Sequence, residues 1–487
     1  MVSNKHRFIK NLSLLYLATV ISKAFALIVN IILIRRLGAS IYGAYGFALT
    51  FVTYFTFIAD SGLSQYGETA ISKDKENVGR ITGDIFSFNL AASIFSTILM
   101  LVFILFIFKF RQIQINILLL FSVLPLFDSF GFNYTVKAME RNYILAISSF
   151  SGRLVYFIGV LIFAINCKDY LFAALFYITG AFITSVIQFG FVKRIIGKIQ
   201  LNFSFKNFKH LVLNALPLGL VSAFVIVYTS LPVIFLKILS SDKNIGYYYI
   251  TNRLVIFVFM LFTLMAGAFI PIISEAVKNK DLNKQVSILS ELLRFAYTFS
   301  LPLCFGGFAV SKLIILRFFG SSYILSAYLL QIMVWSIFFV GISSVFSGYL
   351  ISINDRKSLI SAAFITTLAG LAASPLLIEF YGVYGSAWAN LLIEFTMALF
   401  LIIFTLKKNG IYKGIKLKID KLNLFKVLLF SAIMGLTVRI LIYSLNLGLV
   451  LSIISGIFIY GFLSFLFKTL KSQDVEELKA VIFKSNK

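Results

Sequence analysis

Long apolar segments, separated by short polar ones, fill most of this chain. An α-helix needs about 20 apolar residues to cross the hydrocarbon core of a bilayer. The apolar stretch that begins at residue 12 is too long for the core of a signal peptide and ends in two arginines, so it predicts a retained first span. On the same rule the chain predicts fourteen spans, at residues 12–34, 44–60, 85–108, 114–134, 145–166, 170–192, 211–236, 247–272, 295–318, 324–351, 358–378, 383–406, 424–445 and 447–467.

The composition supports this interpretation. Of the 487 residues, 60% are hydrophobic and 13% are charged, whereas soluble proteins carry about 25% charged residues. So many apolar side chains exceed what a globular core can bury. We therefore predict an all-α polytopic membrane protein with 14 transmembrane helices, and we exclude the soluble, disordered and fibrous classes.

The net charge of +25 reports topology rather than a nucleic-acid partner. If the N-terminus is cytoplasmic, 31 of the 44 Lys and Arg residues fall on the cytoplasmic side, 10 on the outer side and 3 within spans. This bias is the positive-inside signature of a membrane protein. It predicts a multi-pass protein of the cytoplasmic cell membrane with both termini in the cytoplasm.

Residues suited to catalysis or metal binding are scarce. The two cysteines lie far apart in apolar sequence, and both histidines lie in basic flanks. There is no phosphate-binding glycine loop and no long outer loop. The sequence thus predicts neither an enzyme nor a metal or organic cofactor, and it leaves open only a coupling ion, H⁺ or Na⁺.

Two long basic loops divide the chain into six, six and two helices. The predicted parts are an N-terminal six-helix lobe (1–200), a C-terminal six-helix lobe (201–410) and helices 13 and 14 with a cytoplasmic tail (411–487). Because six is even, both lobes have the same orientation, as in parallel repeats whose substrate site lies at their interface. Residues 273–294 predict an interfacial amphipathic helix between the lobes, with a solvated linker as the alternative.

Cations inside predicted spans are candidate site residues, since such a charge costs about 2.5–3.5 kcal/mol on insertion scales. They usually face protein or a wet cavity. Lys23 lies near the middle of the first span and shares a helical face with Tyr16 and Asn30, which predicts a cavity-facing polar stripe. The alternative is a structural salt bridge. Arg153, in the fifth span, either lines the cavity or snorkels to the inner surface.

Two acids and a further cation also fall within spans. Glu394, central in the twelfth span, is a candidate proton or Na⁺ site, a counter-ion for a cation such as Lys23, or a protonated structural group. Asp128, nearer the inner end of the fourth span, is a second candidate for ion coupling. Arg439, in the thirteenth span, is either a paired structural residue or a contact for a lipid headgroup or tail groove.

The seventh predicted span combines polar side chains with two prolines. Asn214 and Tyr228 share one helical face with Pro217 and Pro232. Proline leaves a backbone carbonyl unpaired and lets a helix bend, and broken helices beside a cavity are common in transporters. The pattern predicts a cavity-lining helix, with a static kink as the alternative.

Four segments together resemble a known family. They are Arg35–Tyr45 (RRLGASIYGAY), Asp60–Gln65 (DSGLSQ), Gly246–Leu254 (GYYYITNRL, with Pro271 closing the span) and Gly382–Ala387 (GVYGSA). In this order and spacing, which cover nearly the whole chain, they resemble the polysaccharide (O-antigen-type) flippases of the multidrug/oligosaccharidyl-lipid/polysaccharide exporter superfamily.

The resemblance implies two V-shaped six-helix lobes that alternate between inward- and outward-open states around a cationic cavity. It implies translocation of a polyprenyl-(pyro)phosphate-linked oligosaccharide from the inner to the outer leaflet, with a lipid-tail groove beside helices 13 and 14. On this hypothesis the pyrophosphate is bound by three cations, Lys23, Arg153 and Arg253. The sugars are bound by four polar residues, Tyr16, Asn30, Asn214 and Tyr228. For Arg253, a plain interfacial arginine is the alternative.

The expected partners are the lipid-linked oligosaccharide, membrane lipids and, among proteins, a glycan polymerase or glycosyltransferases. Two other functions stay open. A multidrug or organic-cation antiporter of the same superfamily needs an acidic cavity, whereas the spans hold three cations and two acids. An integral-membrane glycan polymerase usually presents acids or arginines on a long outer loop, which this sequence lacks.

Overall fold

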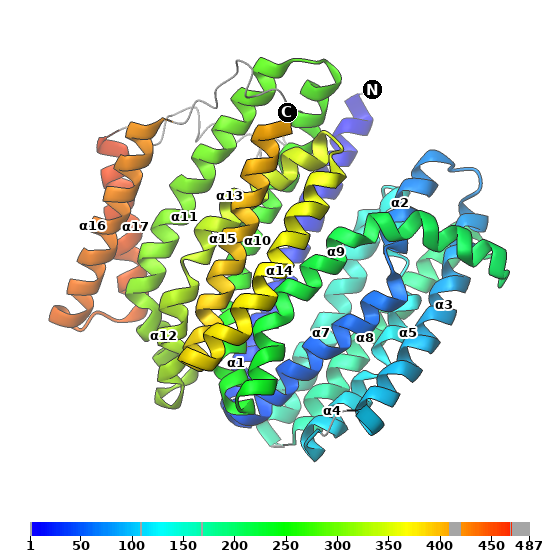
Figure 1. The fold of residues 1–487 in the computed structure, drawn as a ribbon, viewed down its shortest axis with the longest axis horizontal. Helices are drawn as coiled ribbons and strands as arrows, with labels where there is room; N and C mark the ends of the chain where they lie inside the picture. The colour runs from blue at the N-terminus through cyan, green and yellow to red at the C-terminus, as the bar shows by residue number, and fades with distance from the viewer. Residues whose placement is uncertain (1, 108–109, 167–168, 409–419, 468, 470–487) are drawn as a thin grey trace. The chain divides into compact units, whose positions relative to one another are not determined.

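The computed structural model describes residues 2–107, 110–166, 169–408, 420–467 and 469, without the side chains of 2–19, 107, 163–166, 205 and 408. The described residues form helices and no strand (Figure 1). The chain divides into two compact units, Met1–Ser230 and Leu231–Lys487. This boundary lies inside a helix, and the three-part division drawn from the sequence stays a prediction.

The helices of unit 1 are α1 (Val2–Asp60), α2 (Leu63–Lys73), α3 (Val78–Val102), a π-helical turn (Phe103–Ile107), α4 (Gln112–Phe121), α5 (Leu124–Ser129), α6 (Asn133–Ala138), α7 (Asn142–Asn166) and α8 (Tyr170–Ile196). Helix α9 (Phe205–Leu239) begins in unit 1 and ends in unit 2. Unit 2 continues with α10 (Asp242–Lys278), α11 (Leu282–Phe319), a 3₁₀ turn (Ser321–Tyr323), α12 (Ile324–Met333), α13 (Ser336–Ser352), α14 (Arg356–Tyr381), α15 (Val383–Lys408), α16 (Lys421–Leu445) and α17 (Leu449–Leu466).

The described helices confirm the predicted fold class but not the predicted number of spans. Twelve helices are long and apolar enough to cross a membrane, and a thirteenth is added if the pair Ser321–Met333 and Ser336–Ser352, bent by 44°, counts as one span. The spans predicted at residues 12–34 and 44–60 lie on the two sides of Gly38, the kink at which the two helical arms of α1 meet, and α1 enters this number as one helix.

Helix α1 is too long for a single straight crossing. Its 59 residues would extend about 88 Å at 1.5 Å per residue, whereas the hydrocarbon core is about 30 Å thick. Gly38, with φ 78° and ψ 165°, interrupts the helical geometry in a conformation that suits glycine. In Figure 1 the helix descends to one end of its unit, turns and returns.

Close approaches at glycine bring the helices of unit 1 together. A Cβ added to Gly152 of α7 would overlap the carbonyl oxygen of Gly180 in α8, and the reverse also holds. At the start of α2, a Cβ on Gly62 (φ +87°) would lie 2.7 Å from the Cα of Gly219 in α9. Small residues allow membrane helices to pack backbone to backbone. These contacts therefore hold α7 on α8 and α2 on α9.

An extended segment, residues 197–204, connects α8 to α9 and lies across α3; we call it the strap. The Asn202 side-chain amide donates to Asp84 Oδ1 (2.9 Å), and the Asn202 backbone N–H donates to Ser87 Oγ (2.8 Å). The backbone of Gln200 lies so close to Gly83 that an added Cβ would overlap its carbonyl oxygen. The strap thus fixes where α9 begins.

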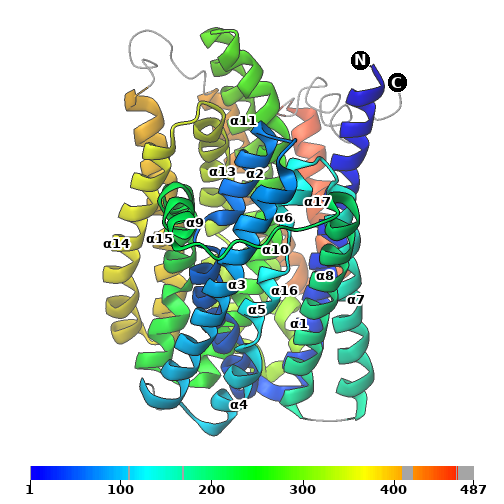
Figure 2. The same ribbon diagram turned by 90° about the vertical axis from the view of Figure 1, so that its right-hand side faces the viewer.

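Helix α9 changes direction along its length. In Figures 1 and 2 its first part runs across the helices of unit 1, and the helix then turns away from that direction. The helix contains Pro217 and Pro232, and proline permits such bends. The boundary between the units, Ser230–Leu231, falls beside the second proline.

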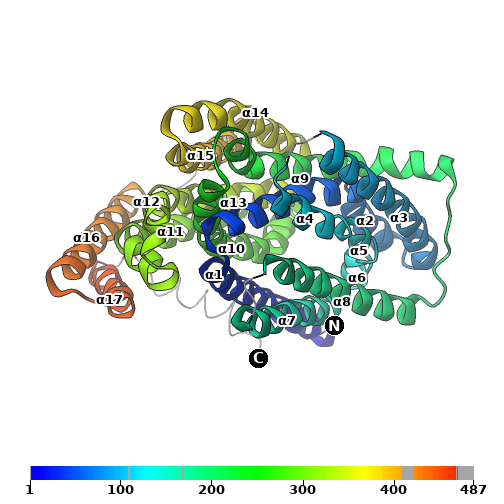
Figure 3. The ribbon, with the colours of Figure 1, turned by 90° about the horizontal axis from the view of Figure 1, so that it is seen from below.

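In unit 2, α10, α13 and α15 pack together, and α14 packs on α15. Helices α16 and α17 lie on the α11 side of the unit, apart from α14 and α15 (Figure 3). Val310 of α11 forms an apolar cluster with Met434 and Val438 of α16. The C-terminal helix pair is therefore anchored through α11.

Residues 273–294 do not form the separate interfacial helix expected from the sequence. Helix α10 continues to Lys278, and α11 begins at Leu282, where Asp281 Oδ1 accepts from the backbone N–H of Lys284 (2.9 Å). The amide of Gln285 in α11 donates to the carbonyl oxygen of Ala276 in α10 (3.3 Å). The apolar residues of this region instead pack the two helix ends against each other.

The docking of the strap makes a testable prediction. Substitution Gly83→Ala should lower the free energy of unfolding by about 1–3 kcal/mol, because the new Cβ overlaps a backbone atom that has little room to move. Thermal unfolding of the purified protein in detergent measures the effect. Gly190→Ala is the matched control, since no atom lies within 4 Å of its added Cβ. Equal melting of the two variants would contradict the described packing.

Candidate functional site

The predicted stripe on α1 is engaged within its own unit. Lys23 is partly buried. Asn30 donates from its amide to the carbonyl oxygen of Ala26 (2.7 Å) and accepts from the Tyr42 hydroxyl (2.8 Å). This last bond joins the two halves of α1 across the turn at Gly38. The side chain of Tyr16 lies outside the described residues, so its predicted role stays a prediction.

Arg153 lies at the middle of α7. Eleven residues, or about 16 Å at 1.5 Å per residue, separate it from the first residue of the helix, Asn142. The helix begins three residues earlier than the predicted span. The two roles expected for Arg153, lining the cavity and snorkelling to the inner surface, stay predictions.

The side chain of Arg153 is exposed on a particular side of α7. The aliphatic stripe formed by Ile147, Ile158 and Ile162 is 44–52% exposed, as expected for a surface in contact with lipid. At 3.6 residues per turn, Arg153 lies about 120–180° around the helix from each member of this stripe. In the described part of the chain it forms no hydrogen bond or ion pair with another residue. Its charge is thus directed away from the aliphatic face.

Two aromatic residues near Arg153 connect α7 to α1. Phe157, four residues after Arg153 and on the same side of α7, stacks on Phe25 of α1 with ring centroids 4.9 Å apart. The hydroxyls of Tyr156 and Tyr45 are 2.9 Å apart. The helix that carries Arg153 thus contacts α1 both before and after the kink at Gly38.

The structure does not bring the two polar residues of α9 together. The amide of Asn214 donates to the carbonyl oxygen of His210, one turn earlier (2.7 Å), and its side chain is exposed. Tyr228 is buried and lies fourteen residues, about 21 Å, further along the helix. Their common role in binding sugars stays a prediction.

Arg253 of α10 is held by an aromatic residue of its own helix. Its guanidinium lies 4.5 Å from the ring centroid of Tyr249 and donates to the Tyr249 hydroxyl. Such a cation–π contact lowers the cost of placing the charge in an apolar span. The Arg253 side chain is therefore positioned by Tyr249 on α10. Its contact with pyrophosphate stays a prediction.

Glu394 is a buried acid at the centre of unit 2. Its side chain is 7% exposed and Asn390, one turn earlier in α15, is 6% exposed. The Asn390 Oδ1 atom is buried without a hydrogen-bond partner, and Glu394 has no ion-pair partner among the described residues. Tyr248 of α10 lies within electrostatic range of Glu394 and accepts a hydrogen bond from the Asn252 amide (3.0 Å). Together these groups offer oxygens suited to a proton or a hard cation.

Asp128 lies on the short helix α5, where its side chain is exposed and within electrostatic range of Asp60. Asp60 has a clear structural task, because Oδ1 accepts from the backbone N–H of Ser64 at the start of α2 (3.0 Å). A carboxylate at a helix N-terminus is stabilising. The first half of the Asp60–Gln65 motif thus builds the turn from α1 to α2.

Arg439 lies where α16 meets α11. Its guanidinium is 5.5 Å from the ring of Phe308 in α11 and 6.0 Å from that of Tyr443, and its side chain is exposed. Many apolar residues of α17 are exposed as well, among them Val450, Ile457 and Phe458. This arrangement suits contact with lipid, so the lipid-groove role of Arg439 remains a proposal.

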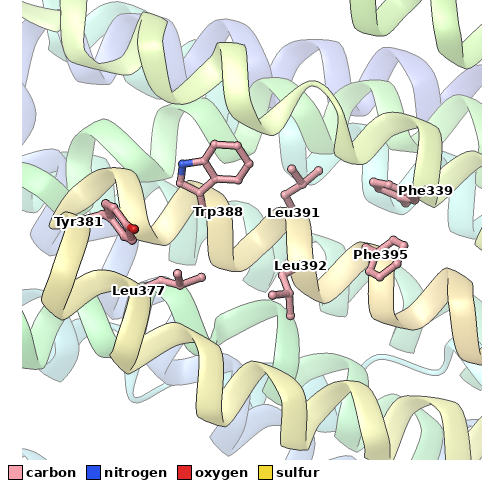
Figure 4. A pocket seen from close by; sticks show the side chains of 7 residues that line it. All are labelled: Phe339, Leu377, Tyr381, Trp388, Leu391, Leu392 and Phe395. Carbon is pink, nitrogen blue, oxygen red and sulfur yellow. The ribbon is translucent and has the colours of Figure 1, made fainter.

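A pocket of about 570 Å³ opens in unit 2 between α13, α14 and α15. Figure 4 shows Tyr381 and Trp388 towards one end, Phe339 and Phe395 at the other, and leucines between them. Its lining includes no charged residue and none of the predicted site residues. It therefore suits hydrocarbon rather than a phosphate group.

Sequence reasoning did not identify Tyr248, the residue of another helix that lies within electrostatic range of Glu394. Tyr248 belongs to a quoted motif, Gly246–Leu254, but its position in that motif says nothing about a carboxylate 146 positions later. The signal that was available is the pair Asn390 and Glu394, which lie at i and i+4 on one face of α15.

The sequence matches the family described as polysaccharide biosynthesis protein over residues 8–277, and the MatE family over residues 217–376. The lipid II flippase MurJ, in an inward closed conformation, has a similar structure, with a TM-score of 0.73 and 18% identity over 93% of this chain and 98% of MurJ. An inward-facing multidrug resistance MATE transporter of the MOP superfamily gives a TM-score of 0.69 and 12% identity over 83% of this chain and all of the other. No curated protein sequence matches the chain.

A third similar structure is a MOP superfamily transporter from Pyrococcus furiosus, with a TM-score of 0.63 and 14% identity over 84% of this chain and 97% of the other. The fold is therefore that of the multidrug/oligosaccharidyl-lipid/polysaccharide (MOP) superfamily, and the molecule is a multi-pass membrane protein. Because the match to residues 8–277 covers more than half of the sequence, the chain belongs to the polysaccharide biosynthesis protein family. The resemblance drawn from the four segments is confirmed.

The hydrogen bond across the turn of α1 makes a second prediction. Tyr42→Phe should cost about 1–3 kcal/mol of stability, because it leaves the Asn30 Oδ1 atom without its donor in a largely buried setting. The midpoint of thermal unfolding measures this loss. Tyr143→Phe, at a more exposed position of α7, is the control and should leave the midpoint unchanged.

Proposed function

We propose that the protein is a flippase that moves a polyprenyl-(pyro)phosphate-linked oligosaccharide from the inner to the outer leaflet of the cytoplasmic membrane by alternating access. Membership of the polysaccharide biosynthesis protein family and a fold like that of MurJ support a lipid-linked substrate. The same comparisons favour transport over catalysis. Both termini are then cytoplasmic, as the distribution of Lys and Arg predicts.

The observation that carries the substrate class is the position of Arg153. A guanidinium in the middle of α7, exposed away from the aliphatic face and without an ion-pair partner in the described chain, is available to bind an anion. A pyrophosphate headgroup supplies that charge and accepts two parallel hydrogen bonds from a guanidinium. Lys23, on the helix packed beside α7, and Arg253, in unit 2, are the other proposed phosphate contacts.

The four proposed sugar contacts differ in the hydrogen bonds that they already form within the protein. Tyr228, which is buried in α9, and Tyr16 are proposed as two of these contacts. The Asn30 amide already binds Tyr42 and Ala26, and the Asn214 amide already binds His210, so a sugar would have to displace those bonds or accept from remaining lone pairs. The lipid tail stays in the bilayer beside α16 and α17, near Arg439.

A membrane potential favours this direction of transport. An anionic headgroup that leaves a negative-inside cell gains about 2.3 kcal/mol per charge per 100 mV. Glu394, with the unpartnered Asn390 Oδ1 beside it, is proposed to bind H⁺ or Na⁺ and return the empty carrier. Asp128 is a second proposed coupling residue. No other cofactor is proposed, and a glycan polymerase or glycosyltransferases are the proposed protein partners.

A multidrug antiporter is the second candidate function, favoured by the match to the MatE family over residues 217–376 and by the buried acid Glu394 in α15. The cations Lys23, Arg153 and Arg253 weigh against a cationic drug, because like charges in a low dielectric repel strongly. Drug-resistance profiles of cells with and without the gene distinguish the two functions.

For the flippase, Arg153→Ala should slow translocation by about tenfold or more, since a hydrogen bond to a charged group contributes about 1.5–3 kcal/mol. Flipping of a fluorescent polyprenyl-pyrophosphate oligosaccharide in proteoliposomes is the measurement. Arg153→Lys keeps the charge and should retain part of the rate. Arg356→Ala, at the exposed start of α14, is the control. Wild-type rates in Arg153→Ala would remove the proposed phosphate site.

For ion coupling, Glu394→Gln should abolish the response of translocation to an imposed H⁺ or Na⁺ gradient while leaving headgroup binding intact. The amide keeps the size of the side chain but carries neither its charge nor its titratable proton. Glu379→Gln, at an exposed position of α14, should behave as wild type. A variant that still follows the gradient would exclude Glu394 as the coupling site.

A further inference from the structure

The first part of α9 carries a stripe of exposed side chains that changes in character along the helix. Lys206, Lys209, Leu213 and Leu216 follow one another at spacings of three, four and three residues, which places them on one face. All four are exposed, with Leu213 at 64% and Leu216 at 48%. The stripe begins with two positively charged side chains and ends with two hydrocarbon side chains. This order matches that of an anionic phospholipid, in which a charged headgroup is followed by acyl chains.

The opposite face of this helix is the one that contacts protein. Leu211 and Ala215 are buried in the core cluster of unit 1, and Phe208 packs edge-on against Phe88 of α3, with ring centroids 5.2 Å apart. Gly219 continues the same face towards Gly62 of α2. The helix is therefore docked by one side, and the stripe points away from its own unit.

The stripe lies in a strongly basic part of the surface. Residues 193–216 contain five Lys and Arg residues and no Asp or Glu. These five are all exposed, and none forms an ion pair in the described ranges. Their positions are Lys193, Arg194, Lys198, Lys206 and Lys209. A surface of this kind complements anionic headgroups rather than another basic face of the protein.

The length and direction of the helix suit a position of the stripe at the membrane boundary. The 35 residues of α9 extend about 52 Å, whereas the hydrocarbon core is about 30 Å thick. The excess is accommodated where the first part of α9 runs across the other helices (Figures 1 and 2). Leu201 and Phe203 of the strap are more than half exposed beside it. Exposed apolar residues among lysines are typical of a segment that lies in the interface.

We propose that the strap and the first part of α9 form a binding site for an anionic phospholipid of the adjacent leaflet. Lys206 and Lys209 contact the headgroup phosphate, and Leu213 and Leu216 lie along its acyl chains. The hydrogen bonds from Asn202 to Asp84 and Ser87 fix the site on α3. This lipid is a resident of the bilayer, so the site does not depend on which substrate the protein transports.

The position of the site suggests what it does. Helix α9 is the segment that leaves unit 1 and enters unit 2 at Ser230–Leu231. A lipid that holds the first part of α9 therefore holds the start of the connection between the units. Transport should accordingly depend on the fraction of anionic lipid in the membrane.

The lipid class is tested with the triple substitution Lys198→Gln, Lys206→Gln and Lys209→Gln. Native mass spectrometry of the full-length protein, titrated with phosphatidylglycerol and with phosphatidylcholine, measures binding. We expect about tenfold weaker binding of phosphatidylglycerol and no change for phosphatidylcholine, because only the charged headgroup loses its partners. The matched control removes three exposed lysines of the α10–α11 turn: Lys278→Gln, Lys280→Gln and Lys284→Gln.

Equal loss in the two triple variants would overturn the proposal, because it would show a general effect of charge. The geometry is tested separately with spin labels at Leu213→Cys and Leu211→Cys in nanodiscs, in a background with Cys167→Ser. The label at 213 should be accessible to oxygen and protected from a water-soluble nickel complex. A label at 213 that the nickel complex reaches freely would also overturn it. Neither readout involves the transported substrate, so failure of the flippase proposal would leave these outcomes unaffected.

Discussion

The cost of a polar group in hydrocarbon governs this molecule. A backbone N–H or C=O without a partner costs several kcal/mol in lipid, so each span must be a helix whose hydrogen bonds close within it. The same cost applies to side chains. Every polar residue inside a span must find a neighbour, a wet surface or a ligand.

Polar residues of the spans divide into those that are already engaged and those that are not. The Asn30 amide and the Arg253 guanidinium have partners within their own helices, and these contacts stabilise the fold. Arg153 and the Asn390 Oδ1 atom have no such partner in the described chain. An ion or a headgroup gains most where the protein has not already supplied the counter-charge or the donor. The second set is thus the more informative about transport.

The sequence predicted the helical membrane fold because an apolar run of about 20 residues has few other stable structures in a bilayer. It did not predict how runs join. The spans at 12–34 and 44–60 are halves of α1, since the turn depends on one glycine and on the hydrogen bond from Tyr42 to Asn30. Residues 273–294 form the end of α10 and the beginning of α11, which pack against each other and are joined by the Gln285–Ala276 hydrogen bond.

From the sequence, candidate site residues could be placed within a single helix, but contacts between helices could not be predicted. The sequence placed Glu394 and Arg153 inside spans, but Tyr248 approaches Glu394 from a different helix. The bend of α1 also depends on a contact between residues that are separated in the sequence. The Tyr42–Asn30 hydrogen bond ties the two arms of α1 together across Gly38. Lys23, on the first arm, and Tyr45, which contacts Tyr156 of α7 from the second, therefore belong to one connected unit.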